Sequence, residues 1–196
     1  MKIIPLPKGK TVESTNEIQE ILKKGMGVQD ALSFGQKASK DIQVFEAFLD
    51  IALHQQNKEA DKAAWVIYKA VLECECAFAG NYQNNLMNAL CEKTFSPTVL
   101  RELLKVLLHL HPEHHEHFGL LFDRAQEWMF DLTAPAAIRY ASLNVIELAG
   151  KKFPELIPEC WEIIQNAKEL ADGPWQRRCK KVQLTLDRRY KKHIDQ

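Results

Sequence analysis

Hydrophobic side chains recur with helical spacing along almost the whole chain. The alternation of apolar and polar residues that is typical of strands is missing, and the 196 residues include only 8 glycines. Apolar positions three or four residues apart predict helices at 12–24, 28–39, 41–54, 58–78, 81–93, 97–110, 113–131, 135–151, 154–171 and 174–192. The pattern therefore predicts an all-α protein.

Three of the predicted helices begin at a proline, and a polar residue lies one or two positions before that proline. The segments are Ser96-Pro97, Thr133-Ala134-Pro135 and Asp172-Gly173-Pro174, and they lie 37 to 39 residues apart. The polar side chain can accept hydrogen bonds from free N–H groups of the first turn, where the missing N–H of a proline costs nothing. We therefore expect a capped helix start at each segment.

Identical residues recur at a similar interval. Arg101, Arg139 and Arg177 are 38 residues apart, and so are Leu72, Leu110, Leu148 and Leu186. Because this interval is the length of one antiparallel helix pair, it predicts a repeat protein in which successive pairs stack.

The last three predicted helices differ in the number of their apolar faces. The helix at 154–171 has two, with Trp161 on one and Cys160 on the other, so we expect it to be buried between neighbours. The helix before it carries one stripe, formed by Ile138, Ala141, Val145 and Leu148. The final helix also has one stripe, formed by Trp175, Cys179, Val182 and Leu186, and its other faces are nearly all charged, as suits the end of a stack.

We expect a single domain, 1–196, with three parts. Residues 1–55 form an irregular N-terminal cap, because closely spaced glycines interrupt the helical pattern there. Helix-pair repeats occupy 56–172, and 173–196 form a capping helix with a basic tail.

The segment from Pro135 to Pro158 resembles a HEAT repeat, with a proline early in the first helix, a short apolar pattern and a basic residue near the turn. Asp61–Trp65 and Trp175–Arg178 are similar to segments of a group of small, uncharacterised bacterial HEAT-like proteins of the ARM type. In that group an Arg-Ala-Ala-Trp segment begins the repeat array and an Arg-rich helix ends it. Here Lys62 stands where arginine is usual. The resemblance covers roughly residues 58–190 and implies an all-α, right-handed α-α superhelix of HEAT-like helix pairs.

This resemblance implies little about activity. Some small proteins of this kind carry enzyme labels such as adenylosuccinate lyase, but the Gly-Ser-Ser loop of such lyases is missing from this sequence. The sequence also has no Gly-rich phosphate loop, nucleophile elbow or His-Glu-x-x-His segment. We therefore expect a protein without enzymatic activity and without a cofactor.

Cysteine usage and the first residues bear on location. The five cysteines are an odd number in apolar settings, which is typical of reduced thiols in a cytoplasmic protein. Residues 1–10 lack the apolar core of a secretion signal, and no apolar run is long enough to span a bilayer. We expect a cytoplasmic protein that does not enter membranes.

Five histidines fall within nine residues, together with two glutamates. They are His109, His111, His114, His115 and His117. Imidazoles and carboxylates at this spacing could bind a divalent transition metal, if His111 and His115, or His114 and His117, share a helical face. The alternative is a solvated, pH-sensitive corner, because the cluster straddles Pro112 and no distant ligand is evident.

The arginines at equal spacing have two interpretations. Arg101, Arg139 and Arg177 could stack into a basic ladder, or each could bridge to the next repeat as a structural contact. We expect a scaffold that presents a surface to a protein or peptide partner. Its candidate contacts are these arginines together with Arg178, Arg188, Arg189, Lys191 and Lys192.

The alternative partner is a nucleic acid. Residues 173–196 carry eight basic and two acidic residues, a charge of +6, in a chain whose 26 basic and 26 acidic residues balance. Such a helix could contact phosphates. HEAT-like proteins include DNA alkylation-repair glycosylases, which hold a damaged base with aromatic residues and use a carboxylate. Here those roles would fall to the four tryptophans and to Asp123 or Asp131, although Trp161 and Trp175 lie on predicted core stripes.

Overall fold

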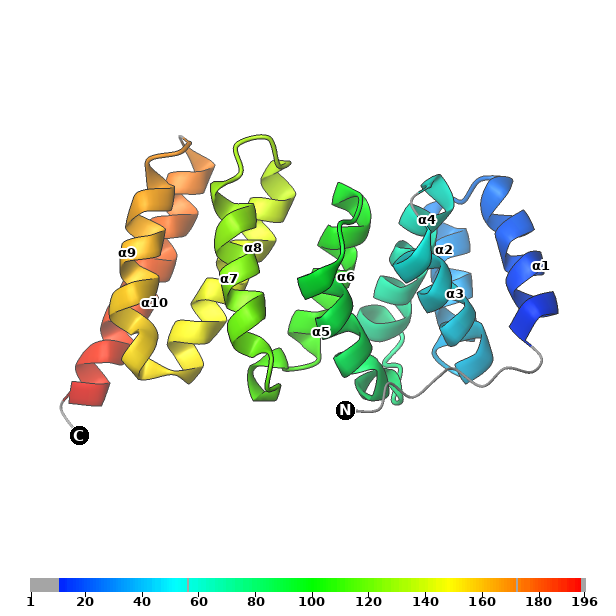
Figure 1. The fold of residues 1–196 in the computed structure, drawn as a ribbon, viewed down its shortest axis with the longest axis horizontal. Coiled ribbons are helices and arrows are strands. Elements are labelled where there is room, and N and C mark those ends of the chain that lie inside the picture. Colours follow the sequence, from blue (N-terminus) through cyan, green and yellow to red (C-terminus); the bar gives the residue numbers. More distant parts are fainter. Residues whose placement is uncertain (1–10, 56, 172, 195–196) are drawn as a thin grey trace. The chain divides into compact units, whose positions relative to one another are not determined.

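The computed structural model describes residues 11–55, 57–171 and 173–194, with side chains from residue 17 onward (Figure 1). This part of the chain forms helices and turns and no strand, which confirms the all-α class. The α-helices are α1 (Thr11–Lys23), α2 (Val28–Ala38), α3 (Ile42–His54), α4 (Lys58–Tyr68), α5 (Gln83–Glu92), α6 (Pro97–His109), α7 (Phe118–Phe130), α8 (Ala136–Lys152), α9 (Ile157–Lys168) and α10 (Pro174–Ile194). Between them lie a π turn, η1 (Lys69–Glu73), and three 3-10 turns, η2 (Ala79–Tyr82), η3 (Pro112–His114) and η4 (Pro154–Leu156). None of these helices combines the length and the apolar character that crossing a membrane requires.

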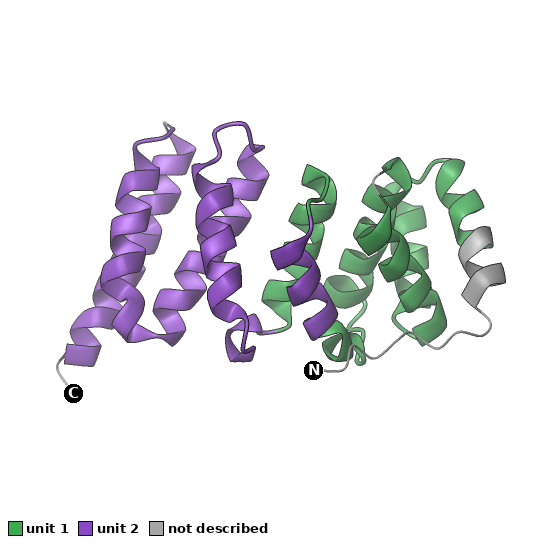
Figure 2. Ribbon diagram, in the orientation of Figure 1, with its two compact units in different colours: residues 1–83, 94–110 green, residues 84–93, 111–196 purple. Residues whose placement is uncertain are grey.

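The helices gather into two compact units (Figure 2). The first contains residues 1–83 and 94–110, and in it α3 packs against α4, α4 against α6, and α2 against both α4 and η1. The second contains residues 84–93 and 111–196, and in it α8 packs against α7, α9 and α10, and α9 against α10. Within each unit, paired helices bury their apolar faces against one another, as a helical repeat requires.

The predicted helix starts are confirmed in one case and wrong in another. Before α6, Ser96 Oγ accepts a hydrogen bond from the N–H three residues on, at 3.2 Å, and Pro97 occupies the first turn. Before α8, Thr133 does not cap the helix, because both its N–H and its hydroxyl donate to Asp131 Oδ1. The predicted cap Asp172 lies outside the described residues.

Backbone geometry shortens two predicted helices. The helix predicted at 58–78 ends at Tyr68, because the chain widens there into η1 and then turns at Glu75, whose φ is 52°. The helix predicted at 113–131 begins only at Phe118, because His111 adopts a left-handed φ of 57° and the 3-10 turn η3 follows it. In both places a conformation outside the α region ends the helical hydrogen-bond pattern.

Two glycines allow close approach between elements. A Cβ at Gly35 in α2 would lie 2.7 Å from Lys69 Cβ, so only a residue without a side chain lets α2 pack against η1. A Cβ at Gly150 in α8 would lie 2.8 Å from Leu186 Cδ2, so this glycine makes room for α10. Packing, not a turn, selects glycine at both positions.

The predicted apolar stripes are confirmed only in part. Ile138, Ala141 and Val145 are buried in α8, whereas Leu148 on the same stripe is half-buried. Trp161, which its spacing placed in the core, is 40% exposed on α9. Equal spacing therefore does not produce equal burial, because burial depends on the surface that each side chain faces.

Leu148 and Leu186 provide a test of this difference. Leu186 is fully buried against Gly150, so Leu186→Ala should lower the free energy of unfolding by about 2–5 kcal/mol. The half-buried Leu148 should lose only about 1 kcal/mol on the same change. Urea unfolding of both variants measures the two losses, and equal losses would contradict the unequal packing of these leucines.

Candidate functional site

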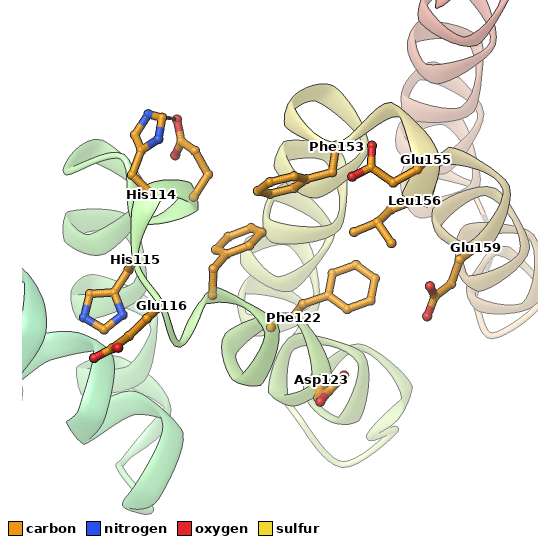
Figure 3. A pocket seen from close by; sticks show the side chains of 12 residues that line it. His114, His115, Glu116, Phe122, Asp123, Phe153, Glu155, Leu156 and Glu159 are labelled. Carbon is orange, nitrogen blue, oxygen red and sulfur yellow. Dashed lines mark ion pairs between the residues drawn. The ribbon is translucent and has the colours of Figure 1, made fainter. Parts of the chain in front are cut away.

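The second unit contains an open cleft of about 680 Å³ between η3, α7, η4 and the start of α9 (Figure 3). The chain segments that form it are 113–123 and 153–159, which lie far apart in the sequence. Because α8 packs against both α7 and α9, it holds these segments on either side of the cleft. A cleft of this size is within the range of sites that accommodate several side chains of a ligand.

Apolar side chains form the floor of the cleft. Phe118 and Phe122 lie one turn apart in α7, so they share one face of the helix, and each is only 6% exposed. The rings of Phe118 and Phe153 pack with their centroids 5.8 Å apart, and Leu156 completes the floor (Figure 3). Phe153 precedes Pro154, which forces an extended conformation on it and ends α8 at the edge of the cleft.

Carboxylates line the cleft above this floor. They belong to Glu116, Asp123, Glu155 and Glu159, and all four side chains are labelled in Figure 3. Asp123, Glu155 and Glu159 are exposed and form no ion pair with any described residue. Glu116 lies 3.8 Å from His117 Nε2, an interaction that is ionic only when the histidine is protonated. The cleft therefore combines an apolar floor with an excess of negative charge.

A buried carboxylate at η3 fixes one wall. The side chain of Glu113 is 1% exposed, and Lys152 Nζ from the end of α8 lies 2.8 Å from its Oε1. Burial alone would raise the pKa of Glu113, but Lys152 and the nearby His111 hold that pKa below its ordinary value. Neither carboxylate oxygen has a hydrogen-bond partner of good geometry in the described part of the chain. The ion pair joins η3 to α8 and so sets the width of the cleft at this end.

The histidine corner does not have the geometry on which the metal hypothesis depends. Residues 111–117 are not part of one helix, so the proposed pairs His111 with His115 and His114 with His117 do not share a helical face. His115 Nδ1 accepts a hydrogen bond from the His117 N–H at 3.0 Å, and burial, aided by His117, lowers the pKa of His115. His111 and His114 flank Glu113 at 3.5 and 3.7 Å, but Lys152 already occupies that carboxylate.

Among the described residues, no group of three or more His, Cys, Asp or Glu side chains is arranged to hold a metal ion. His114 and His115 instead line the cleft beside the carboxylates.

The equally spaced arginines have unlike surroundings. Arg101 forms an ion pair with Glu102 at 2.6 Å in the first unit. In the second unit, Arg139 lies over the Trp175 ring, 5.7 Å from its centroid, while Arg177 is exposed. The surroundings of the three arginines differ in kind, so they give the basic-ladder interpretation no added support.

Arg178, one residue after the repeat position, bridges two helices, whereas the bridge was predicted for Arg101, Arg139 and Arg177. Its guanidinium on α10 contacts Glu147 and, at 2.8 Å, Asn144, both on α8. Further along α10, Arg188, Arg189 and Lys192 line a hollow of about 260 Å³ with Lys151 and Thr185. Lys191 is exposed outside that hollow.

The sequence alone does not indicate the cleft. Among its acidic residues, Asp123 was predicted only as a possible carboxylate of a DNA glycosylase, and Glu113 and Glu116 only as neighbours of the clustered histidines. Two local signals in the sequence mark the walls of the cleft. One is the pair of aromatic residues Phe118 and Phe122 near Asp123, and the other is Pro154 beside Glu155. Nothing in the spacing shows that these two segments meet, because residues 124–152, which form the end of α7, a loop and all of α8, lie between them.

The ion pair of Glu113 yields a pH-dependent prediction. Because the pKa of Glu113 is lowered in the folded state, the ion pair stabilises the protein at pH values above the pKa of an ordinary exposed glutamate. This stabilisation is lost as the pH falls through the lowered pKa of Glu113. Lys152→Met leaves a buried carboxylate without a cation, so it should lower the free energy of unfolding by about 3 kcal/mol at pH 7. The loss should shrink at pH 4, where Glu113 can protonate in the variant. Urea unfolding at both pH values measures it, with Glu113→Gln/Lys152→Met as the control, and an equal loss at the two pH values would contradict the prediction.

Comparison with known proteins agrees with the helical architecture. A family model described as a HEAT repeat domain matches residues 18–172, which is more than half of the chain. No curated protein and no solved structure matches it. The match begins within α1 and includes every helix from α2 to α9, and α10 lies beyond it. The chain belongs to the HEAT repeat family.

Proposed function

We propose that this protein is a non-enzymatic scaffold that binds a protein or peptide, and that the cleft between α7 and α9 is the binding site. The observation that carries the proposal is the cleft itself, a hollow of about 680 Å³ with aromatic side chains on its floor. Aromatic rings at the base of a hollow can anchor a partner side chain that leaves water. The size suits a short polypeptide segment better than a broad, flat protein surface.

The polar groups of the cleft and the cysteines support binding over catalysis. Burial raises the pKa of the Cys160 thiol to about 12 and that of the Cys179 thiol to about 11, so neither is a ready nucleophile at neutral pH. His115, at the cleft, has its Nδ1 occupied by the backbone of His117. Within the described part of the chain, Asp123, Glu155 and Glu159 of the rim form no ion pair or side-chain hydrogen bond with a histidine, cysteine or serine.

A substitution that fills the cleft tests this proposal. A Cβ at Gly119 in α7 would meet nothing within 4 Å, and a helical leucine is favoured over glycine, so Gly119→Leu should fold normally and occupy the cleft. We expect a partner that the wild-type protein captures from nuclease-treated native lysate to be lost from this variant, as measured by quantitative mass spectrometry.

The matched control is Gly80→Leu. A Cβ at Gly80 in η2 also meets nothing within 4 Å, and Gly80 does not line the cleft, so this variant adds the same exposed side chain elsewhere. Equal recovery of every captured protein by wild-type protein and both variants would rule out the cleft as the binding site.

A second candidate function, nucleic-acid binding, has its own supporting observation. Thr185, Arg188, Arg189 and Lys192 follow one face of α10 and meet Lys151 of α8 at a shared hollow. Arg188, Arg189 and Lys192 form no ion pair with another described residue, so their charges are available to an anion. Cations held in a row along a helix are suited to a phosphate backbone.

The nucleic-acid candidate predicts a specific loss. The variant Arg188→Gln/Arg189→Gln/Lys191→Gln/Lys192→Gln should bind labelled duplex DNA or RNA more weakly, with the slope of log K against log salt reduced by about three to four. Fluorescence anisotropy over a salt series measures both quantities. A quadruple glutamine variant at Lys24, Lys37, Lys40 and Lys58 controls for net charge. If both variants weakened nucleic-acid binding equally, α10 would have no specific role in that binding.

A further inference from the structure

We propose that the cleft selects a basic segment, one in which a lysine or arginine lies beside an apolar residue. This inference rests on the proposed function, because it names the chemistry of the partner that the same cleft would bind. Two features carry it: rim carboxylates that no described cation pairs with, and the apolar floor below them.

The rim carries negative charge that the described residues do not neutralise. Asp123, Glu155 and Glu159 each line the cleft, and none forms an ion pair with another described residue. Glu155 in η4 and Glu159 in the first turn of α9 are like charges on one wall, so they repel one another, although the positive end of α9 offsets this in part. Asp123 lies in the middle of α7, where no helix end compensates it. A cation entering the cleft would relieve this repulsion.

The floor selects which cation fits. Lys and Arg are the cationic side chains that bury a long aliphatic stem while the charged group stays near water. In this cleft such a stem would lie on Phe122, Phe153 and Leu156, with the charged group at the height of the carboxylates (Figure 3). An arginine could also stack on the face of the half-buried Phe153 ring. A small inorganic cation would leave the apolar floor uncovered.

Glu113 takes no part in this selection. Its side chain is 1% exposed, both of its oxygens are buried, and Lys152 Nζ lies 2.8 Å from Oε1. A bound segment would therefore meet the exposed carboxylates of the rim and not Glu113. An acidic or phosphorylated segment would be repelled by those rim carboxylates.

Selection of short random peptides displayed on phage, panned on the full chain, tests the inference. Each selected peptide is then tested against the Gly119→Leu variant, whose cleft is filled. We expect the peptides that this variant no longer binds to be enriched in Lys or Arg next to an aromatic or aliphatic residue. Cleft-dependent peptides that are neutral or acidic would overturn the inference and leave the proposed function standing. If no selected peptide depends on the cleft, the proposed function fails, and the inference fails with it.

An isosteric variant makes the test independent of any packing change. For one selected peptide carrying a fluorescent label, Asp123→Asn/Glu155→Gln/Glu159→Gln should weaken binding by about tenfold, the sum of three exposed charge pairs. Replacing the basic residue of the peptide by glutamine should weaken binding to wild-type protein by a similar factor. Glu75→Gln/Glu92→Gln/Glu169→Gln, at three exposed positions outside the cleft, should leave the affinity within about twofold. Equal affinity of the cleft variant and wild-type protein would overturn the inference.

Discussion

The geometry of the second unit depends on one ion pair in a place that water does not reach. Glu113 lies in the short turn before α7, and its carboxylate is buried, so without a cation its charge would oppose folding. Lys152 supplies that cation from the last residue of α8, with enough exposure of its own for the stem to pass from solvent to the buried oxygen. Because one partner belongs to the turn and the other to a helix end, the pair fixes where α7 starts relative to where α8 stops. The floor of aromatic rings is built on those two ends.

Prolines complete this arrangement at the opposite wall. Pro154 ends α8 by constraining Phe153, and the 3-10 turn that follows redirects the chain before α9 begins. The same turn presents Phe153 and Leu156 to one side and Glu155 to solvent. Thus the residue types that interrupt the helices also supply the functional surface, whereas the helix interiors supply the support. Loops and helix ends held by a rigid scaffold commonly carry the contacts of a binding protein.

Much of the fold could be predicted from the sequence, because the helical spacing of apolar residues and the prolines at helix ends are local signals. The segments at 28–39, 41–54 and 97–110 differ from α2, α3 and α6 by no more than a residue at either end. Predictions failed where a single backbone conformation decided the outcome, as at His111, or where burial depended on a distant surface, as for Trp161. The cleft was missed for the second reason. Its two walls are joined only by tertiary packing, and neither segment contains a motif that indicates the other.

The π turn η1 has a consequence for how this sequence can vary. A π turn is a stretch of helix that holds one residue more than the regular pitch allows, and here the excess residue brings Lys69 against α2, where Gly35 leaves the space. We therefore expect the π turn and the glycine to vary together. Among related chains, the loss of one residue near 69–73 would restore the ordinary helical pitch and free position 35 to carry a side chain. Conversely, if the π turn were retained, a side chain at position 35 would force α2 away from η1.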